Sequence, residues 1–174
     1  MPPIWLTASL LNYSWTVELM VEFSHIKNDR AQMVDVTAKD DVEREAVASG
    51  KIFLRAGTLQ AIREGTVVKG NVLATARVAA TVAIKDTFRL IPMCHPIPIS
   101  AISVDFSEPD GCIEATVRVK STGKTGVEME ALTGVSVALL TIWDMVKSAE
   151  KDTEGQYPAT RISDIRVLEK HKGR

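Results

Sequence analysis

Residues 120–147 read KSTGKTGVEMEALTGVSVALLTIWDMVK, a glycine-rich turn followed by a long and mostly apolar segment. Gly123 and Gly126 suit a turn, and no proline follows until Pro158, so the apolar segment should form one uninterrupted helix. A helix that is apolar on nearly every face is typical of a buried element. We therefore expect this helix to lie in the core, with the rest of the chain organised around it.

One strip of this expected helix is polar. At about 100° per residue, it contains Thr133, Ser136, Asp144 and Lys147, with Glu130 at its edge. Charges in such a place either pair with each other or face a cavity where chemistry occurs. A purely structural Asp–Lys pair at i, i+3 spacing explains the pattern equally well.

Two carboxylates mark the start of the helix. Glu128 and Glu130 are two positions apart, so they point to roughly opposite sides and cannot form a catalytic dyad. Glu130 shares the side of Asp144 and could reach the same site, whereas Glu128 suits a turn, a helix N-terminus or a subunit contact.

The overall composition is that of an ordinary globular domain. The 174 residues are 45% hydrophobic and 25% charged, with a formal net charge of −1. No positive excess is present to hold a nucleic-acid backbone or an anionic membrane, so we expect neither partner. Two cysteines do not make a disulfide framework, and a reducing cytoplasm is the simplest location.

The N-terminal stretch differs from the rest. Residues 1–19 contain neither Lys nor Arg, unlike a secretory signal, and their apolar runs are too short to span a membrane. We interpret residues 1–22 as an extension, for which a strand and an oligomer contact are the two alternatives, before a single catalytic domain over residues 23–174.

The remaining patterns predict an α+β domain. Pro109-Asp110-Gly111 is strong turn chemistry between two alternating strands, which implies antiparallel pairing. We expect a mostly antiparallel sheet with helices on one face, and more apolar helix surface than one such sheet can cover, which indicates an oligomer. The expected strands are 33–37, 43–54, 100–107, 113–120 and 162–168, and the expected helices are 59–63, capped by Thr58 and ended by Gly65, and 72–87.

Two short motifs invite specific interpretations. Gly123-Lys124-Thr125 suggests a phosphate-binding P-loop, but position 118, where that motif needs glycine, is Arg118. A weaker phosphate site at the helix start and an ordinary glycine turn both remain open.

Cys94-His95 lies between prolines that favour a rigid extended loop, in which neighbouring side chains point in opposite directions. One Cys and one His without companion ligands make a zinc site improbable. A buried structural Cys, or a His95 ring nitrogen offered to a ligand, both fit.

Several long strings in the chain resemble the molybdenum cofactor biosynthesis protein C family, the cyclic pyranopterin monophosphate synthases. The strings occur in the family's order over residues 25–170: DVTAK, KGNVLATARVAA, LIPMCHPIPIS, TGKTGVEMEALTGVSVALLTIWDMVK and VLEK. The resemblance implies a ferredoxin-like fold, a hexamer built as a trimer of dimers, and an active site at the dimer interface. It also implies a lyase that converts a cyclised dihydro-GTP into cyclic pyranopterin monophosphate and releases diphosphate.

The resemblance also assigns roles to residues. Asp144, Lys147 and Lys69 match catalytic groups, and the substrate-binding matches are Met93, Cys94, His95, Glu128, Met129, Glu130 and Lys170. An Asp held near a Lys can be tuned to exchange protons near neutral pH, and lysines would neutralise the departing diphosphate. No cofactor or protein-bound metal is expected, although Mg²⁺ could accompany the triphosphate. A catalytically silent nucleotide-binding protein of the same fold is the alternative.

Overall fold

The computed structural model describes residues 26–27 and 30–174. The expected extension, residues 1–22, lies outside the described residues. The described chain begins with β1 (Ile26–Lys27) and β2 (Arg30–Ala31), which pair with each other.

A four-stranded sheet forms the framework of the domain. It consists of β3 (Val42–Phe53), β4 (Ile99–Ser107), β5 (Cys112–Gly123) and β6 (Arg161–Lys172), in the spatial order β4-β5-β3-β6. Every neighbouring pair is antiparallel. With helices between β3 and β4 and between β5 and β6, the chain follows a β-α-β-β-α-β course, so the expected ferredoxin-like α+β fold is confirmed.

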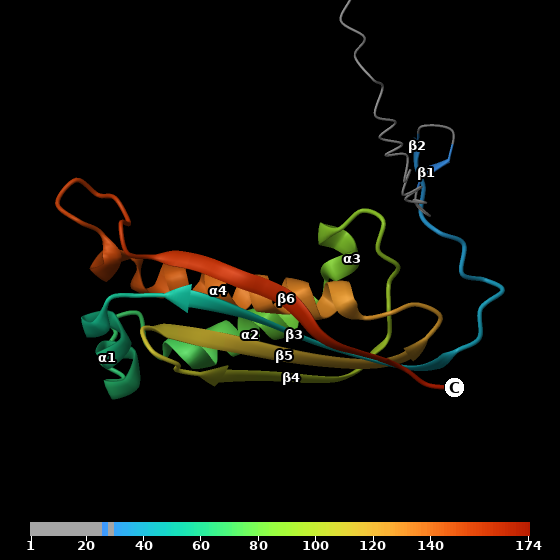
Figure 1. The fold of residues 1–174 in the computed structure, drawn as a ribbon, viewed down its shortest axis with the longest axis horizontal. Coiled ribbons are helices and arrows are strands. Elements are labelled where there is room, and N and C mark those ends of the chain that lie inside the picture. The colour runs from blue at the N-terminus through green and yellow to red at the C-terminus, as the bar shows by residue number, and fades with distance from the viewer. Residues whose placement is uncertain (1–25, 28–29) are drawn as a thin grey trace, which may run out of the picture.

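Helices cover one face of this sheet. α2 (Val72–Lys85) and α4 (Glu128–Glu150) lie side by side behind it in Figure 1, while α1 (Ala56–Glu64) and the short α3 (Thr87–Leu90) lie near opposite ends. The core forms where alternate residues of the strands meet the two long helices; Val117 of β5, Ile84 of α2 and Leu139 of α4 belong to the same buried cluster. The sequence prediction that α4 is a core helix is therefore confirmed.

α4 is also the one described helix long and apolar enough to cross a membrane by length and composition, but 56% of the tested window is buried in the domain. Its composition is accounted for by this core position.

Gly50 in β3 lets α4 approach the sheet closely. A Cβ atom at this position would lie 2.8 Å from Val135 and 3.0 Å from Leu139 of α4, and 2.9 Å from Ile165 of β6. Any side chain here would push the helix away from the strand, because the interior has no free volume to receive it.

Some local predictions were wrong. Residues 33–37 form no strand; the Asp35 carboxylate accepts the Thr37 N–H and the Val36 carbonyl accepts the Lys39 N–H, so the segment turns instead. Thr58 is not a cap but a buried residue inside α1, which begins at Ala56. The expected helix 72–87 ends at Lys85, where Asp86 separates it from α3.

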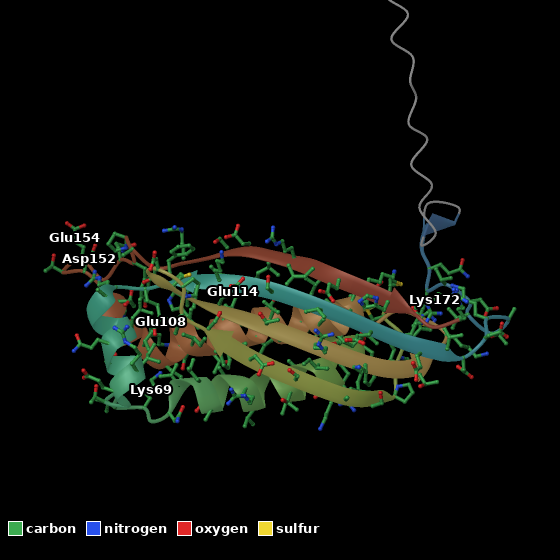
Figure 2. All side chains as sticks on the ribbon, turned by 60° about the horizontal axis from the view of Figure 1, so that its bottom comes forward. Lys69, Glu108, Glu114, Asp152, Glu154 and Lys172 are labelled. Carbon is green, nitrogen blue, oxygen red and sulfur yellow. The ribbon has the colours of Figure 1, made fainter. Side chains whose placement is uncertain are left out.

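The ends of α4 lie at opposite ends of the domain. Its C-terminal end faces α1, and its N-terminal end lies at the end of the domain that holds α3 and the C-terminus of the chain (Figure 1). Figure 2 shows the same separation, with Lys69 at the α1 end and Lys172 of β6 at the other.

Candidate functional site

Three charged side chains meet at the C-terminal end of α4, and we call Lys69, Asp144 and Lys147 the triad. Lys147 Nζ lies 2.7 Å from Asp144 Oδ1, as the i, i+3 spacing predicted. Lys69 Nζ lies 2.9 Å from Asp144 Oδ2 and donates to the Asp144 carbonyl at 2.7 Å. One carboxylate is thus held between two ammonium groups.

Local turns deliver Lys69 to this position. Gly70 has φ +98°, a left-handed conformation that glycine adopts without strain, and its N–H donates to the Val67 carbonyl. Asn71 then caps α2 by accepting the Ala74 N–H at 2.9 Å. Lys69 is therefore the last side chain of the tight turn that connects α1 to α2.

The triad is charged and open to solvent. The Asp144 side chain is 59% exposed. Hydrogen bonds from Lys147 and then Lys69 lower the Asp144 pKa to about 2, and the bond to Asp144 raises the Lys147 pKa. The expectation that this pair is tuned toward neutral pH is wrong for the single chain, because pairing without burial favours both charged forms.

A cavity of about 420 Å³ lies at the other end of α4, and we call it the N-terminal pocket. Six of the seven expected substrate-binding residues line it from two segments, the turn before β4 and the first turn of α4. The lining includes Met93, Cys94, His95, Glu128, Met129 and Glu130.

Cys94 and His95 line the same pocket, contrary to the expectation that they point apart. The expected loop is not extended throughout, because the chain turns at residues 92–93, where the Cys94 N–H donates to the Ile91 carbonyl. His95 Nε2 lies 2.8 Å from the Val34 carbonyl; because a carbonyl only accepts, this nitrogen carries a proton. Burial and the nearby Glu130 raise the Cys94 pKa.

Glu130 is the buried carboxyl group of this pocket. The residue is 3% exposed, and its Oε2 has no hydrogen-bond partner among the described residues. Burial, with a smaller contribution from Glu128, raises the Glu130 pKa to about 7. The group tuned to neutral pH is therefore Glu130.

Lys170 does not line this pocket, but it forms an ion pair with Glu128, which does. Lys170 lies on β6 opposite Ala46 of β3, and the ion pair brings its ammonium group to the first turn of α4. A lysine from the C-terminal strand is thus held at the edge of the pocket.

Sequence reasoning missed several pocket-lining side chains, among them Val34, Val36 and Lys39. Val34 and Val36 belong to the segment expected to be a strand, and Lys39 follows it; the segment instead lies at the cavity and is held by Lys124, whose Nζ lies 2.8 Å from the Thr37 carbonyl. No spacing rule in the sequence pointed to them, because their place depends on a tertiary contact.

A single chain does not bring the expected site residues together. Glu130 and Asp144 are fourteen positions apart on α4, which at about 1.5 Å per residue separates them by roughly 21 Å. The triad and the N-terminal pocket are therefore two distinct groups within one protomer.

No metal cluster is evident in this part of the chain: the described residues contain no group of three or more His, Cys, Asp and Glu side chains that could hold an ion. Lys69 and Lys147 of the triad, together with Lys170, offer positive charge to an anionic ligand.

Comparison with known proteins gives consistent matches. The model of the MoaC family matches residues 33–173. Three relatives from Methanoregula boonei, Methanosphaerula palustris and Methanospirillum hungatei are 76%, 68% and 71% identical over 154, 154 and 153 residues. These matches cover 88% of this chain and 99%, 100% and 98% of the relatives, each of which bears the name "Probable cyclic pyranopterin monophosphate synthase".

Proposed function

The chain belongs to the MoaC family, and from this premise we propose that it is a cyclic pyranopterin monophosphate synthase. The reaction is the conversion of (8S)-3′,8-cyclo-7,8-dihydroguanosine 5′-triphosphate to cyclic pyranopterin monophosphate with release of diphosphate, a lyase step of molybdenum cofactor biosynthesis. The observation that carries the proposal is the triad, an ionised carboxylate between two lysines in a chain 76% identical to a relative of that name.

The triad suits the proton transfers of the reaction. With a pKa of about 2 in the single chain, Asp144 is ionised at neutral pH and is a weak base there. Burial of the triad against a partner subunit would raise this pKa and let Asp144 accept a proton, while Lys147 and Lys69 donate hydrogen bonds. Lysine ammonium groups also stabilise the negative charge that develops on a departing diphosphate.

The N-terminal pocket suits recognition of the purine-derived part of the substrate. It offers the largely buried Glu130, the ring of His95 and apolar side chains such as Met93. A few polar groups in an apolar cavity are typical of small-molecule sites. A carboxyl group with a pKa near 7 can either donate or accept a hydrogen bond near neutral pH.

The complete site is shared between two subunits in this proposal. Groups that serve one ring system must come within hydrogen-bond distance of it, about 2.6–3.2 Å, yet the triad and the pocket are roughly 21 Å apart in one chain. A two-fold dimer that sets the triad of one protomer against the pocket of its partner would create two complete sites.

Exposed apolar side chains support an oligomer. On the outer helix surface, Leu140 of α4 is 58% exposed, and Val78 and Val82 of α2 are 65% and 55% exposed. Apolar surface of this kind is commonly covered by another subunit. A hexamer built as a trimer of dimers is the assembly we propose, in the cytoplasm, with no resident cofactor and with Mg²⁺ only as a companion of the triphosphate.

The test is turnover of the purified cyclised substrate by the purified protein. We expect the pterin product and one diphosphate for each substrate consumed. Tight binding of the substrate without product would instead identify a catalytically silent nucleotide-binding protein. No binding and no product would contradict both the proposed reaction and the proposed site.

A further inference from the structure

Glu150, the last residue of α4, is a carboxylate buried at a junction of three segments. It is 0% exposed. Its two oxygens accept the Arg55 N–H at 3.2 and 3.3 Å, and Thr160 Oγ1 donates to Oε2. A fully buried carboxylate is costly unless its oxygens are hydrogen-bonded, so this junction is a specific structure.

The contact with Arg55 supplies α1 with the cap that its own sequence lacks. Arg55 is the N-cap residue, and its side chain makes no capping hydrogen bond within the described chain. The first turn of α1 also contains no acidic residue. In a capping box a glutamate of the same helix bonds to the N-cap N–H; here Glu150 does so from α4, and its negative charge favours the helix N-terminus.

α1 and the turn that carries Lys69 are one connected unit. The N–H groups of Gly65 and Thr66 donate to carbonyls of the last turn of α1, those of Ile62 and Ala61. The Gly70 N–H then closes the turn onto Val67. A shift of α1 relative to α4 would therefore carry Lys69 with it.

Two other features could fix the position of Lys69: the link to α2 through Gly70 and the packing of α1 beside α4. Neither replaces the Glu150 contact. Gly70, with φ +98°, separates Lys69 from α2, and glycine is the residue that resists backbone rotation least. Between α1, the Lys69 turn and the last turns of α4 lies a cavity of about 430 Å³, lined by Thr58, Val67, Met145 and Ala149 among others. α1 packs on the core through Leu59, but at this cavity it is not in close contact with α4.

We propose that Glu150 is a positioning residue: its buried carboxylate fixes the start of α1 to the end of α4 and so holds Lys69 where it reaches Asp144. Asp144 and Glu150 are six residues apart on the same helix. The contact of Glu150 with Arg55 and that of Asp144 with Lys69 therefore attach α1 and its following turn to one rigid helix. This role rests on the proposed function, since the triad is its catalytic centre.

The direct readout is the Asp144 pKa, measured by carbon-13 NMR titration of the carboxyl group. The value is about 2 with both lysines in place, and Lys69→Ala raises it because one of the two donors is lost. We expect Glu150→Ala to raise the Asp144 pKa in the same direction. Glu150→Gln, which keeps an acceptor for the Arg55 N–H, should restore most of the wild-type value.

Two controls separate this role from a general effect. In a Lys69→Ala background, Glu150→Ala should add no further shift of the Asp144 pKa. The matched control is Glu154→Ala, an exposed glutamate of the next loop, which should leave the pKa unchanged.

A second variant covers the case in which Glu150→Ala does not fold. Arg55 has φ −63°, which proline adopts, so Arg55→Pro removes the donated N–H, together with a side chain that makes no capping hydrogen bond, and retains Glu150 and Thr160. It should raise the Asp144 pKa as Glu150→Ala does. A folded Glu150→Ala or Arg55→Pro protein that loses thermal stability but keeps the wild-type Asp144 pKa would overturn the proposal, because Glu150 would then be structural only.

Turnover provides a separate readout. Misplacement of Lys69 by about 1 Å should lower kcat by roughly tenfold to 10²-fold in Glu150→Ala, with recovery in Glu150→Gln and no change in Glu154→Ala. If the wild-type protein shows no turnover, the proposed function fails, while the NMR titration still decides whether Glu150 positions Lys69.

Discussion

The pKa of a carboxyl group is shifted in opposite directions at the two ends of α4. At the C-terminal end, exposed Asp144 lies between two lysines and has a pKa of about 2. At the N-terminal end, Glu130 is buried without a partner for Oε2 among the described residues, and its pKa is about 7. Charge pairing dominates where solvent is near, and desolvation dominates where it is excluded.

This difference separates the chemistry that each end can perform. Asp144 is ionised at neutral pH in the single chain and orients the two lysines. Glu130 changes charge near neutral pH and can follow the protonation state of a bound ring. Substitutions at the two ends should therefore have different effects, and a substitution midway along α4 should affect neither end.

The largest effect is expected from Asp144→Asn. The change removes the proton acceptor and the charge that holds both lysines, so kcat/KM should fall by about 10²–10⁴-fold. Circular dichroism and thermal melting should be close to wild type, because the side chain is 59% exposed. The control is Asp110→Asn in the β4–β5 turn. A loss below tenfold in a folded protein would remove Asp144 from the reaction.

The next effect concerns stability and its dependence on pH. Between pH 4.5 and about 7, folded Glu130 retains a proton that the unfolded chain has lost, so this group makes stability fall as pH rises. Glu130→Gln should remove that slope and stabilise the protein at pH 8 by on the order of 3 kcal/mol. Chemical denaturation at several pH values measures it, with exposed Glu154→Gln as control. An unchanged slope would mean that Glu130 is not held in its neutral form.

A substitution in the middle of α4's contact with the sheet should affect neither end. Gly50→Ala places a methyl group within 2.8–3.0 Å of three side chains, which should cost about 1–3 kcal/mol. The folded fraction should keep its kcat. Gly57→Ala in α1, where no atom lies within 4 Å of the added methyl group, is the control and should be neutral or slightly stabilising. Equal stability of the two variants would contradict the close approach at Gly50.

Local patterns predicted the fold well. The β4–β5 hairpin followed from turn chemistry at Pro109-Asp110-Gly111, and α2 and α4 followed from their long apolar segments with glycine or asparagine at the start. The pair of Asp144 and Lys147 followed from helical spacing alone. In each case the residues that decide the structure are neighbours in the sequence.

Contacts between distant segments could not be predicted in this way. Lys69 reaches Asp144 across 75 positions, and Glu150 caps α1 across 95. Local patterns place the cap of α1 at Thr58, inside the helix, because they cannot reveal an acceptor that comes from α4. The opposite pKa shifts of Glu130 and Asp144 could not be predicted either, because they depend on burial and on charged neighbours in the folded chain and not on residue type.

The smallest effect is expected from deletion of residues 1–19. Sequence reasoning assigns this stretch to neither end of α4, and the family match starts at residue 33. Turnover by the shortened protein should differ from wild type by less than about twofold. Aggregation or loss of turnover would show that the stretch takes part in the assembly.

Complementation between opposite ends tests the shared site most directly. Asp144→Asn protein is mixed with Lys170→Ala protein, each inactive alone, under conditions in which subunit exchange is verified by mass spectrometry. Half of the randomly mixed dimers contain one of each chain and regain one intact site of two, so about a quarter of wild-type activity should return. The same-end mixture of Asp144→Asn with Lys69→Ala should remain inactive, because those residues touch within one chain. Verified exchange without recovery in the opposite-end mixture would contradict a site built from the triad of one subunit and the N-terminal pocket of its partner.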